Sequence, residues 1–142
     1  MSKLGPIIIA EEDIDDRDVL REVLKSLEVR NDIRFFDNGQ QVLNYLRTTK
    51  EQPFLILSDV NLPLMSGTRL REEINKDEPL RRKSIPFVFL TTNVEKEAVA
   101  KAYDMTVQGY FGKEDNKQQI RDTLKMVIDY WCTCQHPNNN SY

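Results

Sequence analysis

Acidic, hydroxyl and amine side chains follow directly after short apolar runs at four places in the chain. If folding brings these segments together, their carboxylates repel one another and raise each other's pKa, and a hard divalent cation such as Mg²⁺ relieves that repulsion. Beside such a cation, Asp59 has the chemistry of a carboxylate nucleophile toward a phosphoryl group. Thr91 and Lys113 could then bind the phosphoryl oxygens as a hydroxyl donor and an ammonium. The four segments are Glu11-Glu12-Asp13, Ser58-Asp59-Val60-Asn61, Thr91-Thr92-Asn93 and Gly112-Lys113.

The spacing of apolar residues predicts that short strands and longer helices alternate along the chain. Runs rich in β-branched and aromatic residues predict strands at residues 6–10, 33–36, 54–58, 85–90 and 107–111. Apolar positions at helical spacing predict helices at residues 14–27, 40–48, 68–77, 94–103 and 116–132, with a turn signal at 77–79. The predicted order is therefore strand then helix, five times.

This strict alternation predicts an α/β fold, a (βα)5 doubly wound arrangement with one parallel sheet and helices on both of its faces. The first, third and fourth runs are apolar almost throughout, as buried central strands must be, whereas the second and fifth include polar residues or Gly. The second and fifth strands are thus the expected edges, which gives the flavodoxin-like strand order 2-1-3-4-5. Function in such a sheet gathers at the carboxyl ends of the strands, where the four segments lie.

Length and composition limit the class of protein. The 142 residues suit one domain, which we expect at 1–134, followed by a polar, disordered tail at 135–142. A net charge of −3 without a basic block argues against nucleic-acid binding. No apolar run approaches the roughly 20 residues that a bilayer crossing needs, and the N-terminus lacks a signal-peptide core. We therefore expect a cytoplasmic protein with no membrane partner.

The ordered residues at the strand ends resemble those of the response-regulator receiver domain, the phosphoacceptor module of two-component signalling, in its single-domain, chemotaxis-type form. Each match alone is weak, but five matches in order at the correct strand ends are specific, and the resemblance covers residues 6–131. The matching residues are Glu11 and Glu12 for the acidic pair after the first strand, Asp59 for the phosphoacceptor of the D-x-x-x-P loop Asp59-Val60-Asn61-Leu62-Pro63 before Gly67, Thr91 for the switch hydroxyl, Tyr110 for the aromatic switch residue and Lys113 for the lysine.

The resemblance implies a phosphoacceptor function and a metal site. A sensor histidine kinase or a histidine phosphotransfer protein would donate phosphate to Asp59, with Mg²⁺ held by Glu11, Glu12, Asp59 and the carbonyl of Asn61. The expected protein is a stand-alone receiver, since no segment long enough for an effector follows the last helix. At most, it would phosphorylate and dephosphorylate its own Asp59.

The resemblance also implies a switch that acts on a downstream protein target. Phosphorylation would draw Thr91 inward, and Tyr110 would follow into the space that Thr91 leaves. The face made by helix 94–103, strand 107–111 and helix 116–132 would then change its affinity for its partner. Asn61 and Asn93 match two positions that tune hydrolysis of the acyl phosphate.

Two residues depart from the pattern of the family. Glu12 stands where Asp is commoner, and its extra methylene must fit a metal shell that tolerates little geometric error. Glu114 stands where the family usually has Pro, so the cis peptide common there is not expected, because a non-proline cis bond costs roughly 2.5–4 kcal/mol.

Several of these residues also have an ordinary structural interpretation. We interpret Asp13 as the N-cap of the first helix, and Asp15, Asp16 and Asp18 as solvated acids of its first turn. Zinc binding in the pattern Cys132-x-Cys134-x-His136 is not expected, because these residues fan out around a helix and too few ligands remain to complete a tetrahedral shell.

The switch residues have alternatives too. Thr92 competes with Thr91 for the role of switch hydroxyl, and Asn93 could be the N-cap of the following helix. Tyr110 could be only a partly buried aromatic residue of an edge strand.

Three other functions remain as alternatives to the phosphoacceptor. Glu12 keeps open a degenerate receiver that binds a protein without phosphate. A phosphatase of the haloacid-dehalogenase type would need a second carboxylate two residues after the nucleophile, where this chain has Asn61. A flavodoxin-like electron carrier would need a hydroxyl- and Gly-rich phosphate loop after the first strand, where this chain has acids that repel a flavin phosphate.

Overall fold

The computed structural model describes residues 2–113 and 116–137, and over these residues the chain forms one sheet of parallel strands. The strands pair in the order β2-β1-β3-β4-β5, which confirms the predicted α/β fold and strand order. β1, β3 and β4 are buried along their whole length, while β2 and most of β5 are partly exposed, as expected for edges. The strands are β1 (Ile7–Ala10), β2 (Ile33–Phe36), β3 (Leu55–Ser58), β4 (Phe87–Thr91) and β5 (Gly109–Gly112).

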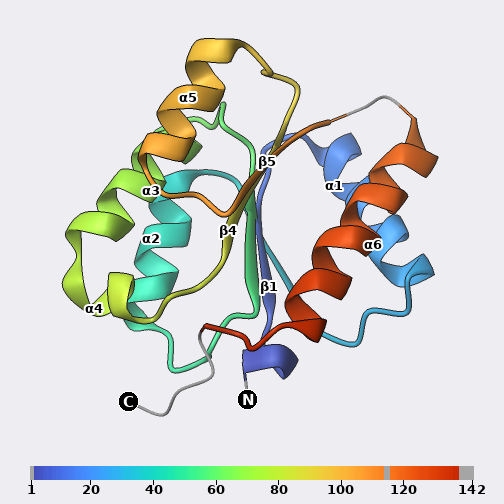
Figure 1. Ribbon diagram of the computed structural model, residues 1–142, viewed down its shortest axis with the longest axis horizontal. Coiled ribbons are helices and arrows are strands. Elements are labelled where there is room, and N and C mark those ends of the chain that lie inside the picture. The colour runs from blue at the N-terminus through green and yellow to red at the C-terminus, as the bar shows by residue number, and fades with distance from the viewer. Residues whose placement is uncertain (1, 114–115, 138–142) are drawn as a thin grey trace.

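Helices cover both faces of the sheet. Figure 1 shows α1 and α6 on one face and α2, α3, α4 and α5 on the other. Successive residues of β1 enter different cores, since Ile7 and Ile9 pack with α1 and α6, whereas Ile8 and Ala10 pack with α2 and α3. The helices are α1 (Ile14–Ser26), α2 (Gly39–Thr48), α3 (Gly67–Lys76), α4 (Glu78–Arg82), α5 (Lys96–Asp104) and α6 (Lys117–Thr133), after a 3₁₀ turn η1 (Ser2–Leu4). Within the described ranges, every helix is too short or too polar to span a bilayer.

The short helix α4 was not predicted. Its first residues coincide with the turn signal at 77–79, which does end α3 but also begins a new helix. The side chain of Asp77 accepts a hydrogen bond from the backbone N–H of Leu80 at 3.2 Å, and Pro79 lies in the first turn. Both residues are common helix starts, because the carboxylate satisfies a free N–H and proline has none to satisfy.

Within the predicted tail, His136 packs against the body of the domain and is only 4% exposed. Its Nε2 lies 2.7 Å from the carbonyl oxygen of Phe54, and its ring stacks on the Phe54 ring at 5.3 Å between centroids. The Trp131 ring lies 5.9 Å away. These contacts join the chain beyond α6 to the start of β3, and a search for periodic apolar residues cannot detect one isolated aromatic contact. Residues 138–142 of the predicted tail, and Glu114 with its predicted trans peptide, lie outside the described residues.

Candidate functional site

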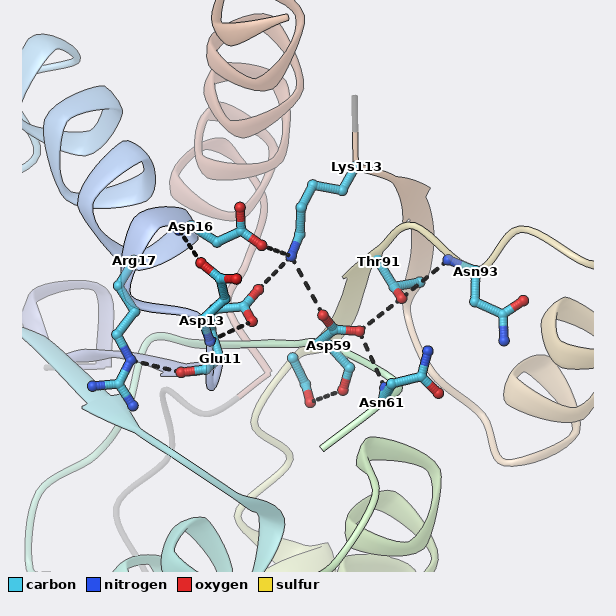
Figure 2. A network of polar contacts seen from close by, with 10 residues as sticks. Glu11, Asp13, Asp16, Arg17, Asp59, Asn61, Thr91, Asn93 and Lys113 are labelled. Carbon is cyan, nitrogen blue, oxygen red and sulfur yellow. Dashed lines mark hydrogen bonds and ion pairs between the residues drawn. The ribbon is translucent and has the colours of Figure 1, made fainter. Parts of the chain in front are cut away.

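The carboxyl ends of four strands bring the candidate residues to one edge of the sheet. Glu11 follows β1, Asp59 follows β3, Thr91 ends β4 and Lys113 follows β5. Backbone hydrogen bonds extend the pairing past the strand ends, with the Asp59 N–H donating to the Ala10 carbonyl at 3.0 Å and the Lys113 N–H to the Thr91 carbonyl at 2.7 Å. Parallel pairing therefore places these side chains side by side, as Figure 2 shows.

The Asp59 carboxylate lies between a hydroxyl and an ammonium (Figure 2). Its Oδ1 accepts hydrogen bonds from the Thr91 hydroxyl at 2.7 Å and from the Asn61 backbone N–H at 3.1 Å. Its Oδ2 accepts from Lys113 Nζ at 3.3 Å. The side chain remains 13% exposed, so the carboxylate is held in one orientation while one side stays accessible to a reactant.

The loop after Asp59 fits closely against the start of α3. The Gly67 N–H donates to the Val60 carbonyl at 2.9 Å, and a Cβ atom at residue 67 would lie only 2.1 Å from the Asp59 carbonyl oxygen. Real Cβ atoms do not approach so closely, so the loop requires glycine at this position. A steric clash with the Asp59 carbonyl therefore explains why glycine occupies position 67, which is part of the family pattern.

Lys113 joins the acidic residues into one cluster. Its Nζ donates to Glu11, to Asp16 Oδ2 at 3.0 Å and to Asp59 Oδ2 at 3.3 Å, and its side chain is only 8% exposed. Burial alone would lower the pKa of Lys113, but the hydrogen bond and charge of Glu11, with those of Asp16 and Asp59, outweigh burial and raise it. Lys113 is therefore a permanent cation in this cluster.

Glu11 is the most deeply buried acid of the site, at 4% exposed. Its Oε2 accepts from the Asp13 backbone N–H at 3.2 Å, and its own carbonyl accepts from Arg17 Nε at 2.6 Å, so both side chain and backbone are fixed. Burial raises the pKa of Glu11, although Lys113 partly offsets this effect. Asp13 is confirmed as the N-cap of α1, because its side chain accepts from the Asp16 N–H.

Asp16 is the member of this cluster that the sequence did not indicate. It was interpreted as a solvated acid, yet its carboxylate contacts Lys113 and its side chain is 43% exposed. The signal was its spacing, because a residue three positions after an N-cap lies in the first helical turn beside the capping residue. Asp16 therefore lies near enough to the strand ends to contact Lys113, whereas Asp15 and Asp18 are exposed.

Glu12 is the predicted ligand that the structure does not bring into the cluster. It is exposed, and its side chain forms none of the hydrogen bonds or ion pairs found within residues 2–113 and 116–137. Over the same residues, no three His, Cys, Asp or Glu side chains are arranged around a common metal position. The oxygens of Glu11 and Asp59 lie beside the loop of Asn61 and match the hard oxygen donors that Mg²⁺ prefers. The oxygen donors of the site thus fit a hard divalent cation. In this structure the carboxylates of Glu11 and Asp59 contact Lys113.

The predicted switch residues form a second, adjacent group. The Asn93 N–H donates to the Thr91 hydroxyl at 3.3 Å, and the Tyr110 hydroxyl donates to the Asn93 carbonyl. Thr91 is fully buried, and the half-buried Tyr110 ring packs 5.6 Å from the Phe89 ring. Asn93 is not the N-cap of α5, which is Glu95, although its side chain accepts from the Glu95 N–H at 3.2 Å. The loop between β4 and α5 is therefore tied to Asp59 through Thr91 and to β5 through Tyr110.

Known proteins share this sequence pattern and fold. The family model of the response regulator receiver domain matches residues 7–125. Response regulator Rcp1 of Synechocystis is 31% identical over 130 residues, which cover 88% of this chain and 87% of Rcp1.

Two solved structures are also similar. The phosphorylated cyanobacterial phytochrome response regulator RcpA has a TM-score of 0.82 and 28% identity, covering 91% of this chain and 94% of its own. The Mn²⁺-bound form of Rcp1 has a TM-score of 0.81 and 27% identity, covering 94% of this chain and 99% of its own. With most of its length matched by the family model and by a relative above 30% identity, the chain belongs to the response-regulator receiver domain family.

Proposed function

We propose that this receiver domain accepts a phosphoryl group on Asp59 from a histidine kinase or a histidine phosphotransfer protein, and that the aspartyl phosphate changes the face formed by α5, β5 and α6. Receiver domains of this family take phosphate from histidine kinases. The observation that carries the proposal is the Asp59 carboxylate, held between the Thr91 hydroxyl at 2.7 Å and the Lys113 ammonium at 3.3 Å at the carboxyl edge of the sheet.

The chemistry assigns one role to each of these side chains. An Asp59 oxygen attacks phosphorus while the bond from phosphorus to the donor's histidine nitrogen breaks, and that nitrogen keeps the electron pair. Lys113 stabilises negative charge on the phosphoryl oxygens, because its raised pKa keeps it protonated. The Thr91 hydroxyl, which donates to Asp59 in this structure, can donate to a phosphoryl oxygen instead.

The metal-binding part of the proposal uses Glu11, Glu12, Asp59 and the carbonyl of Asn61. When bound, Mg²⁺ supplies positive charge that offsets the carboxylates and the incoming phosphoryl oxygens. Glu11 and Asp59 already lie in the cluster, but Glu12 has to turn inward from its exposed position. The structure of Rcp1 with Mn²⁺ supports a divalent cation in a similar receiver.

The switch part of the proposal follows from the shared loop. When Thr91 turns toward a phosphoryl oxygen, its hydrogen bond with the Asn93 N–H must change, and Asn93 in turn accepts from Tyr110. The loop carries the start of α5, and Tyr110 belongs to β5, so both elements respond to Asp59. The population of two arrangements of this face would then depend on phosphorylation.

Intact-mass measurement tests the acceptor. The chain is incubated with Mg²⁺ and a small acyl phosphate, beside a sample with chelator, the Asp59→Asn variant and the Asp18→Asn variant as a control for an exposed acid of α1. We expect one Mg²⁺-dependent phosphoryl group in the wild type and in Asp18→Asn, and none in Asp59→Asn. Released inorganic phosphate is assayed in the same samples, because rapid hydrolysis would hide the adduct.

A degenerate receiver that binds its partner without phosphate is the second candidate, and the exposed position of Glu12 favours it. It predicts neither an adduct nor released phosphate in any sample, and that result would overturn the phosphoacceptor proposal. Tyr110→Phe separates the switch from the chemistry, since it removes the donor to Asn93 without touching Asp59. We expect the Phe variant to be phosphorylated but to show smaller changes in the amide NMR signals of α5.

A further inference from the structure

A cavity of ≈ 240 Å³ lies near the amino ends of the strands, whereas Asp59 lies at their carboxyl ends. It is lined near the amino ends of β3, β4 and β5 by Ile56, Ile85 and Gln108, and laterally by α3 and α4. α4 lies at the lower end of the sheet in Figure 1. The cavity is therefore separate from the phosphoacceptor site, and its volume suits a small metabolite rather than a large cofactor.

Arg71 on α3 places a buried positive charge in the wall of this cavity. It is only 8% exposed, and it has no carboxylate partner among the residues that the structure describes. Its Nε donates to the Met105 carbonyl at 3.1 Å, and its Nη2 donates to the carbonyl and hydroxyl of Thr106 at 3.0 and 3.2 Å. These partners are neutral, and none of the hydrogen bonds to described residues uses Nη1. The guanidinium also lies over the Phe87 ring, 5.5 Å from its centroid, and this cation–π contact brings no negative charge. A buried cation without an anion is uncommon, because burying charge is costly unless it is compensated.

The remaining lining of the cavity favours an anion with an apolar part. Among the lining residues that the structure describes none is acidic, and a second guanidinium, that of Arg81, belongs to an exposed residue of α4. The aliphatic side chains come from α2, β3, α3, α4 and the segment just before β4, and they form the apolar wall. The polar and basic lining residues are Arg71, Asn75, Arg81, Ser84 and Gln108.

We propose that this cavity binds a small organic anion, a carboxylate or phosphate monoester on an apolar carbon skeleton. Arg71 is the buried anchor for the anionic group, since a guanidinium suits carboxylate and phosphate oxygens. Arg81 adds a second positive charge, and the aliphatic wall receives the carbon skeleton. The ligand would supply the negative charge that Arg71 does not receive from the described residues.

Amide NMR titration of the full chain tests the proposal with four probes: benzoate, phenyl phosphate, neutral benzamide and inorganic phosphate. We expect saturable shifts at Met105, Thr106 and Gln108 with benzoate or phenyl phosphate, and at least about tenfold weaker binding of benzamide and inorganic phosphate. The tighter of the two organic anions identifies whether the site prefers carboxylate or phosphate. This comparison uses the wild type, so it does not depend on the folding of any variant.

Variants then test whether the guanidinium groups of Arg71 and Arg81 bind the organic anion. Arg81→Ala should weaken the organic anions by about three- to tenfold. Arg82→Ala, an exposed neighbour that does not line the cavity, should leave binding unchanged. Arg71→Lys keeps a positive charge but loses the guanidinium geometry and should weaken binding further. The proposal is overturned if no organic anion gives saturable shifts near the cavity up to about 20 mM, if benzamide or inorganic phosphate binds as tightly, or if Arg81→Ala has no more effect than Arg82→Ala.

Discussion

Replacing Lys113 by Met tests whether one ammonium holds the acidic cluster together. Methionine keeps a long apolar side chain but removes the charge that contacts Glu11, Asp16 and Asp59. The side chains of Lys113, Glu11 and Asp59 are 8%, 6% and 13% exposed, so water can replace the lost cation only in part. The carboxylates would then be close together without compensation.

The expected cost follows from the burial of these partners. Removing one member of a buried ion pair typically destabilises a protein by about 3–5 kcal/mol. We expect the lower end, about 3 kcal/mol, because Asp16 is 43% exposed and Asp59 keeps its hydrogen bonds from Thr91 and the Asn61 N–H.

The pH dependence has a definite sign. Burial already raises the pKa of Glu11 above its ordinary value of 4.5, and loss of Lys113 removes the main effect that opposes burial. A carboxyl whose pKa is higher in the folded state stabilises the fold below its unfolded pKa and loses that contribution as the pH rises. The cost of Lys113→Met should therefore be largest near neutral pH and should shrink as the pH falls toward about 5.

Urea unfolding followed by circular dichroism measures this cost at about pH 7 and about pH 5, with chelator present. The matched control is Lys125→Met, because Lys125 pairs with Asp129 on the exposed face of α6 at 2.6 Å and should cost only about 0.3–0.5 kcal/mol. The double variant Lys113→Met with Asp59→Asn should recover part of the loss, since one repelling charge is gone. A cost below about 1 kcal/mol, or an equal cost at both pH values, would refute the proposed charge balance.

Three further predictions follow from the described contacts. Gly67→Ala would place a methyl group 2.1 Å from the Asp59 carbonyl oxygen, so urea unfolding should show a loss of about 1–3 kcal/mol, and unchanged stability would mean that the loop moves freely. Thr91→Val keeps the shape but removes a donor to a carboxylate, and its expected cost of about 1.5 kcal/mol should shrink in an Asp59→Ala background, which has no acceptor for the hydroxyl, whereas additive losses would contradict the coupling. Burial lowers the pKa of His136, so the unfolded chain binds a proton first as the pH falls, and stability present above about pH 6.5 is lost below it. His136→Gln should reduce this decline, and parallel pH curves for the two proteins would argue against a role for His136.

The fold and the centre of the site were predictable because they depend on repeated patterns. Alternating apolar runs and helical spacing predicted all five strands and their order, and the edge strands differ visibly in polarity. The rule that parallel strands present their carboxyl ends at one edge then brought Asp59, Thr91 and Lys113 together. Each of these three residues lies at or just after the end of a strand. An error of one or two residues in the predicted strand boundary therefore still places it at the carboxyl ends of the strands.

The other residues depend on orientation and on single long-range contacts. Asp16 reaches Lys113 only because the first turn of α1 faces the strand ends, which sequence polarity does not reveal. Arg71 occupies a buried position because its guanidinium reaches the Met105 and Thr106 carbonyls, which are more than thirty residues away in the chain. For Glu12, adjacency to Glu11 in sequence does not place its exposed side chain in the same cluster, and its role as a metal ligand stays a prediction. Such contacts require coordinates.

The charge of the cluster gives a physical reason for the proposed dependence on a divalent cation. When ionised, the carboxylates of Glu11, Asp16 and Asp59 outweigh the ammonium of Lys113 by two negative charges. A phosphoryl group brings further negative charge into the same partly buried space, where like charges repel strongly. Lys113 cannot balance both the carboxylates and the phosphoryl oxygens, because it carries one charge and already contacts all three acids. A divalent cation would supply the missing charge, and Lys113 would then be free to contact the phosphoryl oxygens rather than the carboxylates.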